Sequence, residues 1–80
     1  MEITVKYFGI IADITQKKEE VIFVDDETNT LKKMQLKLEI SYPKILVINY
    51  SIALNQKFLQ NDISLKNNDI IALLPPFAGG

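Results

Sequence analysis

The chain has 80 residues, a formal net charge of −1, and neither cysteine nor histidine. The missing cysteines exclude a disulfide scaffold, a thiolate metal site and a cysteine nucleophile, and the missing histidines remove the usual general base. All nine basic residues are lysines, and the near-neutral charge gives no electrostatic footprint for nucleic acid. No apolar stretch is long enough to span a membrane, so we expect one soluble cytoplasmic domain with neither a nucleic-acid nor a membrane partner.

The first third of the chain has the pattern of two strands. Residues 2–8 alternate apolar and polar side chains, which predicts a strand with one face in solvent. Residues 20–25 are rich in β-branched and aromatic side chains and predict a second strand that pairs with the first. Between them, Gly9 ends the first strand, and residues 10–14 form a short apolar connection with room for one helical turn.

A helix is predicted after the acidic run at 25–27. The polar residues 28–30 are candidate N-caps, and the acidic side chains would lie at the positive end of the helix dipole. Pro43 disfavours helical backbone at the residue before it, so the helix should end near Ser41.

Apolar residues fall on two sides of this helix. Leu31, Met34 and Leu38 share one face, which we expect to pack against the sheet. Leu36 and Ile40 lie on nearly the opposite side, where they are either covered by the next segment or exposed to a partner.

The second half of the chain adds further strands. Residues 45–48 are apolar and fit either a helix or a strand. Residues 52–55 predict a third strand, and residues 57–59 a short continuation after a tight turn. The asparagines at 67–68 suit a turn because asparagine tolerates a positive φ. Residues 69–74 predict a last strand that is apolar on both faces and therefore central in its sheet.

This order of elements predicts an α+β fold. We expect a mixed sheet of four to five strands, with the first and last strands adjacent and central and one main helix packed across one face. Residues 1–80 form a single domain, of which residues 75–80 are an extended C-terminal tail.

The tail has the composition of a reactive terminus. Pro75 and Pro76 stiffen its stem, and Phe77 and Ala78 lead to Gly79 and Gly80. Glycine has no Cβ, so this thin end can thread into the active site of another protein and present one carboxylate there. The alternative is a frayed end. Frayed ends are usually polar, whereas this one is apolar up to its glycines. The alternative role of the two prolines is only to terminate the last strand.

Several stretches resemble the ubiquitin-like β-grasp sulfur carriers. The chain is similar to the small subunit of molybdopterin synthase, also called molybdopterin converting factor subunit 1 or MoaD. The likeness lies in residues 6–14, in the Ala-Leu-Asn-Gln step at 53–56, and above all in the turn, last strand and Pro-Pro-x-x-Gly-Gly ending at 68–80. The family often places a glycine where this chain has asparagines before Asp69.

Two related classes share parts of this pattern. The thiamine-pathway sulfur carrier also ends in Ala-Gly-Gly but usually lacks the proline pair. Ubiquitin-like protein modifiers, which attach to lysines on their targets, commonly carry arginine before Gly-Gly, where this chain has Phe77 and Ala78.

The resemblance implies a chemistry for Gly80. Its carboxylate is ionised at neutral pH and inert as an acyl donor, and the sequence has no phosphate-binding loop for ATP. In the family, an E1-like adenylating enzyme uses ATP to make an acyl-adenylate, and a sulfur donor displaces AMP to leave a thiocarboxylate. The large subunit then takes in the tail, and two such sulfurs convert cyclic pyranopterin monophosphate to the molybdopterin dithiolene.

The resemblance also implies a docking face and no stably bound cofactor. In the family, two small and two large subunits form a heterotetramer, and the small subunit is not catalytic on its own. Phe77, Phe8 and Leu59 are the candidate partner-binding residues. Phe77 would otherwise cap the core, and Phe8 has a plausible structural role. Asn55 and Gln56 most simply form turn hydrogen bonds.

Overall fold

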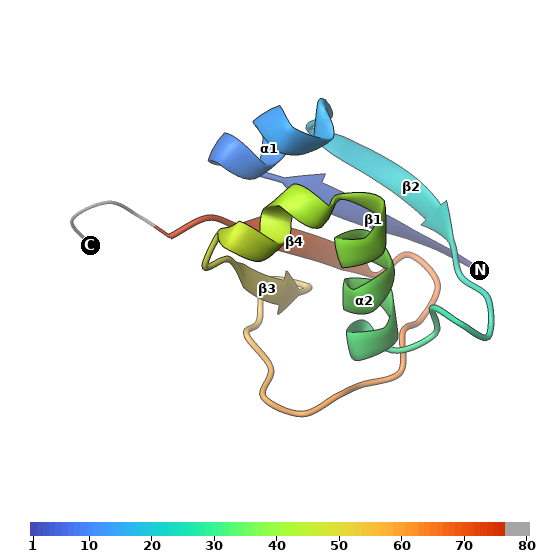
Figure 1. Ribbon diagram of the computed structural model, residues 1–80. Coiled ribbons are helices and arrows are strands. Elements are labelled where there is room, and N and C mark those ends of the chain that lie inside the picture. The colour runs from blue at the N-terminus through green and yellow to red at the C-terminus, as the bar shows by residue number, and fades with distance from the viewer. Residues whose placement is uncertain (77–80) are drawn as a thin grey trace.

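The computed structural model describes residues 1–76, and these form one sheet with helical segments packed on one of its faces (Figure 1). The predicted α+β architecture is confirmed. In chain order, the elements are β1 (Glu2–Tyr7), α1 (Gly9–Thr15), β2 (Glu19–Phe23), α2 (Leu31–Ser41), the 3₁₀ helix η1 (Pro43–Val47), β3 (Ser51–Leu54) and β4 (Ile70–Leu74).

The first and last strands are neighbours in the middle of the sheet, as predicted. The described strands follow the order β2-β1-β4-β3. β1 runs parallel to β4, with Thr4 opposite Ile70 and Tyr7 opposite Leu73, whereas β2 and β3 are antiparallel to the strands beside them. The parallel pairing brings the ends of β1 and β4 to the same end of the sheet.

The predicted short strand at residues 57–59 is wrong, so the described sheet has four strands. Lys57 makes only an isolated bridge to Leu54. The two residues between them, Asn55 and Gln56, have φ angles of 49° and 68°, and this tight turn sends the chain away from the sheet.

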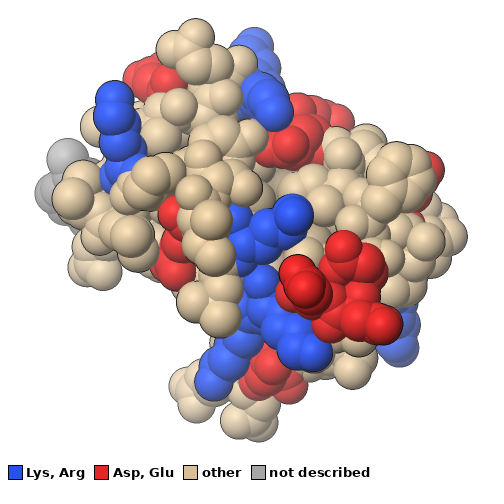
Figure 2. All heavy atoms as spheres, turned by 45° about the vertical axis from the view of Figure 1, so that its right-hand side comes forward, with Lys and Arg blue, Asp and Glu red and all other residues tan. Residues whose placement is uncertain are grey.

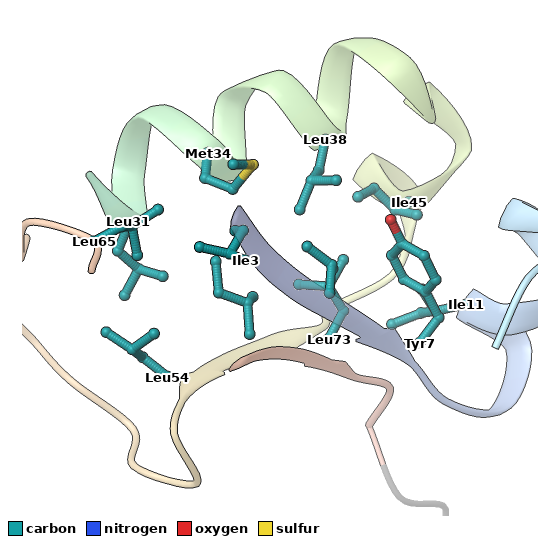
Figure 3. Packing of buried hydrophobic residues seen from close by; sticks show 12 residues of the cluster. Ile3, Tyr7, Ile11, Leu31, Met34, Leu38, Ile45, Leu54, Leu65 and Leu73 are labelled. Carbon is teal, nitrogen blue, oxygen red and sulfur yellow. The ribbon is translucent and has the colours of Figure 1, made fainter. Parts of the chain in front are cut away.

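The core lies between α2 and one face of the sheet (Figure 3). The predicted face of α2, made by Leu31, Met34 and Leu38, is buried. It packs over Ile3, Val5, Tyr7, Ile71 and Leu73 from the two central strands. Ile11 of α1 and Ile45 of η1 close this layer, and both are fully buried.

The prediction that the last strand is buried on both faces is wrong. Ile71 and Leu73 point into the core, but Ile70 on the other face is 40% exposed. The helices cover only one face of the sheet, so the apolar residues on the second face of β4 remain open. The central position inferred from that burial is nevertheless observed, because β4 pairs with β1 on one side and with β3 on the other.

The helical segments begin and end where local chemistry places them. The Thr30 hydroxyl accepts a hydrogen bond from the Lys33 amide at 3.2 Å, so one of the three candidate caps is used, and α2 ends at Ser41 as predicted. Residues 10–14 form a longer helix than the single turn expected. Most of the segment 45–48, which fitted either a helix or a strand, belongs to the 3₁₀ helix η1, and Pro43 lies in the first turn of that helix.

Two further findings concern the outer side of α2 and the length of the helices. Leu36 and Ile40 are exposed, so among the described residues nothing covers that side of α2. Within residues 1–76, no helix combines the length and the apolar character that crossing a membrane requires.

Candidate functional site

The chain leaves the sheet at the end of β4. Pro75 is half-buried and Pro76 is exposed. The remaining tail residues predicted to function, Phe77, Ala78, Gly79 and Gly80, lie outside the described residues. Because β1 and β4 are parallel, the tail starts at the end of the sheet where β1 passes into α1 (Figure 1).

A mostly apolar hollow lies on the open face of the sheet next to this exit. Its volume is about 520 Å³. The residues that line it are Lys6, Phe8, Ala53, Asn55, Gln56, Phe58, Ile70, Ala72 and Leu74. Leu74 directly precedes the proline pair, so the hollow and the stem of the tail form a continuous surface.

Of the three predicted docking residues, the structure describes Phe8 and Leu59, and only Phe8 lines this hollow. Phe8 lines it and is 43% exposed, while the Phe8 carbonyl accepts hydrogen bonds from the amides of Ile11 and Ala12 at the start of α1. The exposed side chain of Phe8 is thus available on the wall of the hollow, while its backbone carbonyl belongs to the first turn of α1. Leu59 is 37% exposed but is not among the lining residues.

Sequence reasoning missed Phe58, which lines the hollow and is 65% exposed. The tight turn at 55–56 was predicted, and it has the positive φ angles that are typical of a tight hairpin. What the sequence did not reveal is that the residue after Lys57 lies beside the open face of β4. The open face of β4, with Ile70 and Ala72, was also missed because the strand was expected to be buried on both sides.

Asn55 holds the wall of the hollow together. Its side-chain carbonyl accepts a hydrogen bond from the Ile70 amide at 2.9 Å, and its NH₂ group donates to Asp69 at 2.9 Å. Asp69 also accepts from the Lys66 amide at 2.7 Å. The predicted turn role of Asn55 is confirmed. Asn68, with φ of 69°, likewise adopts the backbone that a glycine would provide.

A polar cluster ties the sheet to the end of α2. Glu20 accepts hydrogen bonds from the hydroxyls of Tyr7 and Tyr42, and Lys17 donates to Glu20 and to Tyr42. The rings of Tyr7 and Tyr42 meet edge to face, with centroids 5.8 Å apart. The cluster links β1, β2 and the residue that caps α2.

The environment of this cluster shifts its proton equilibria. Burial, followed by the hydrogen bond to Glu20, raises the pKa of Tyr7 well above its ordinary value. Burial alone would raise the pKa of Glu20, but the hydrogen bonds from Tyr7, Tyr42 and Lys17 together outweigh it and lower that pKa. The cluster thus places two hydroxyl donors and one ammonium donor around the Glu20 carboxylate, and these hydrogen bonds tie its elements together.

Charged residues are intermixed over the face shown in Figure 2, where lysines lie beside acidic side chains. Within residues 1–76, no three acidic residues gather into a group that could hold a metal ion.

Comparisons with known proteins agree with this geometry. The sequence model of the ThiS family matches residues 5–80. A protein named as molybdopterin converting factor subunit 1, from Pyrococcus furiosus, has a TM-score of 0.82 at 20% identity, with 96% of this chain and 99% of that chain covered. SAMP1 from Haloferax volcanii has a TM-score of 0.80 at 19% identity, with both chains fully covered (100%).

A third similar structure has higher sequence identity. It is a complex of subunits 1 and 2 of the molybdopterin-converting factor from Helicobacter pylori, with 31% identity, a TM-score of 0.73 and 100% of both chains covered. The first two likenesses establish the fold, and the predicted ubiquitin-like β-grasp is confirmed. This chain therefore belongs to the ThiS family, as a MoaD-like β-grasp protein of the sulfur-carrier type.

Proposed function

We propose that this chain is the sulfur-carrier subunit of a molybdopterin synthase. Gly80 carries sulfur as a thiocarboxylate, and the sulfur is used to build the molybdopterin dithiolene from cyclic pyranopterin monophosphate. The chain acts with a large subunit that supplies the catalytic groups, and it is not an enzyme on its own.

The proposed reaction starts with the Gly80 carboxylate, which is inert as an acyl donor until it is activated. An E1-like enzyme joins the Gly80 carboxylate to AMP from ATP, and pyrophosphate leaves. A sulfide-equivalent nucleophile from the sulfur donor then attacks the acyl carbon, so that a carbon–sulfur bond forms as the bond to AMP breaks. The thiocarboxylate is a better nucleophile than the carboxylate it replaces, and its sulfur bonds to a carbon of the pyranopterin precursor as a carbon–oxygen bond there breaks. Water then hydrolyses the thioester between Gly80 and the precursor, so that the sulfur stays on the precursor and Gly80 regains its carboxylate.

The observation that carries this proposal is the full-length match to the Helicobacter pylori complex at 31% identity. In that complex, subunit 1 is bound to subunit 2, and we propose the same partnership here, in a heterotetramer of two small and two large subunits. The apolar hollow next to the tail supports it, because a surface of this kind on a small domain is typical of a protein interface. We propose Phe77 as a further residue of this interface.

A thiamine-type carrier is the second candidate, because the matching family is ThiS. That function changes the sulfur acceptor but not the chemistry of Gly80. A protein modifier would form an amide between Gly80 and a lysine, and the likeness to SAMP1 supports only the shared fold.

One experiment separates these functions. The chain is prepared with a Gly80 thiocarboxylate and offered to the large synthase subunit with cyclic pyranopterin monophosphate, and separately to a thiazole synthase with its substrates. We expect discharge of sulfur, measured by intact mass, and dithiolene formation only with the large subunit. Discharge only to the thiazole synthase would favour the thiamine pathway, and conjugation to lysines would favour the modifier.

A further inference from the structure

Gly9 lies beside the first residue of the tail. The parallel register of β1 and β4 ends with Tyr7 opposite Leu73. Two residues further along each strand are Gly9, where α1 begins, and Pro75. The chain therefore leaves the sheet next to a residue without a side chain.

The contact between these residues is too close for any other amino acid. A Cβ built on Gly9 would lie 2.9 Å from Cγ of Pro75 and 3.9 Å from its Cβ and Cδ. Real Cβ atoms essentially never approach another heavy atom to less than 3.0 Å. The proline ring is closed on its own backbone and cannot rotate away as a flexible side chain would. Gly9 also has a φ of 55°, which L side chains rarely adopt.

The contact occurs where backbone hydrogen bonding to β1 stops. Pro75 has no amide N–H, so it cannot donate to the ladder that joins β4 to β1. Beyond Tyr7, the chain of β1 turns into α1 rather than continuing beside β4. At this point the Pro75 ring packs close to the bare backbone of Gly9, and Pro75 is half-buried.

We propose that Gly9 is a positioning residue for sulfur transfer. Its backbone forms a seat for the Pro75 ring, and this seat sets the direction in which the tail leaves the sheet beside the hollow. The inference rests on the proposed function, because direction matters only if the tail must enter a partner. A misplacement of about 1 Å at a reacting group can cost on the order of a hundredfold in rate.

Gly9→Ala tests the seat, and Pro75→Ala removes the ring atoms that the new methyl group would meet. The double variant completes the cycle, because a clash between the two residues predicts strong coupling between them. Asn68→Ala is the matched control, since Asn68 also has a positive φ, of 69°, but lies in the turn before β4, far along the chain from the tail. It imposes similar backbone strain without touching Pro75.

The readout is kcat and KM for sulfur transfer from each thiocarboxylated variant to the large subunit, together with thermal melts. We expect Gly9→Ala and Pro75→Ala each to lower kcat by roughly 10- to 100-fold, and the double variant to be no slower than the slower single variant, because both changes remove the same contact. Asn68→Ala should lower the melting temperature and leave kcat unchanged. A normal kcat for Gly9→Ala, or losses that multiply in the double variant, would overturn the inference.

A measurement without the partner keeps the inference apart from the proposed function. By NMR, the wild-type chain should show an Overhauser contact between the Gly9 α-protons and the Pro75 ring. Gly9→Ala should change the residual dipolar couplings of the Phe77 and Ala78 amides and leave those of β2 unchanged. If the wild-type chain transfers no sulfur but these couplings change, the proposed function fails and the seat stands. Unchanged couplings would refute the seat whatever the partner.

Discussion

At the scale of single residues, Glu20 carries the largest share of the polar contacts that the sequence did not reveal. Its carboxylate accepts from two tyrosines and one lysine, drawn from β1, from the end of α2 and from the segment before β2. Its pKa is lowered, because these hydrogen bonds outweigh the effect of burial. Nothing in the sequence pairs residues 7, 20 and 42, since their proximity depends on the folded sheet.

This lowered pKa predicts how stability depends on pH. A carboxylate with a folded-state pKa below its unfolded value stabilises the fold above the unfolded pKa, and that stabilisation is lost as pH falls through the folded-state pKa. We expect urea midpoints of the wild-type chain to fall as pH drops below the usual value near 4.5. Glu20→Gln should lower the free energy of unfolding at pH 7 by about 1–3 kcal/mol and flatten this acid limb.

The matched control is Glu19→Gln, at the exposed neighbouring position. It should leave both the midpoint at pH 7 and the acid limb close to those of the wild-type chain. An acid limb of the same steepness in Glu20→Gln would show that other carboxylates cause it.

Gly79 gives a second prediction at this scale, on a residue outside the described range. Gly79→Val adds a β-branched side chain that restricts the backbone and thickens the tail. If the tail must enter a narrow pocket, sulfur transfer to the large subunit should fall sharply while the thermal melt stays unchanged. Transfer at the normal rate would mean that the tail is not threaded.

At the scale of elements, β4 has one face in the core and one face open. Its buried residues Ile71 and Leu73 pack under α2, and Ile70, Ala72 and Leu74 line the hollow on the other face. Phe58, which follows the short turn at 55–56, lines the same hollow. If the proposed partner binds there, this apolar face serves binding.

The two neighbouring residues after this turn provide a test. Phe58→Ala should weaken the complex with the large subunit by roughly 1–3 kcal/mol, as expected for an aromatic anchor, whereas Leu59→Ala should have a smaller effect. Calorimetric titration of each variant measures the difference, and thermal melts control for folding. A larger loss for Leu59 than for Phe58 would place the interface outside the hollow.

The sequence predicted these elements to different degrees. Alternation in β1, the Thr30 cap and Pro43 after α2 are local signals, and the strands and helix that they predicted are present. The open face of β4 was not predictable from its own residues, because an apolar side chain looks the same whether a helix or a partner covers it. The strand expected at 57–59 is absent because pairing after the turn stops at the single bridge between Leu54 and Lys57, and Phe58 and Leu59 remain exposed instead of joining the sheet.

At the scale of the whole molecule, a single sheet carries the core, the hollow and the start of the tail. One face of the sheet holds the core, the other holds the hollow, and β4 carries the chain past Gly9 to the proline pair. The tail itself was the easiest feature to find in the sequence, because Pro-Pro-x-x-Gly-Gly is a local motif. The contact between Gly9 and Pro75 was not, since it joins residues that are distant in the sequence.

The central claim is that Gly80 is the group that is activated, and removal of that residue tests it most directly. The chain without Gly80 and the full chain are each incubated with the E1-like adenylating enzyme, ATP and labelled pyrophosphate, and exchange of label into ATP is measured beside a thermal melt. We predict that exchange is lost in the shortened chain while its melting temperature is unchanged, because the tail follows the last strand of the core. Full exchange without Gly80 would contradict the account.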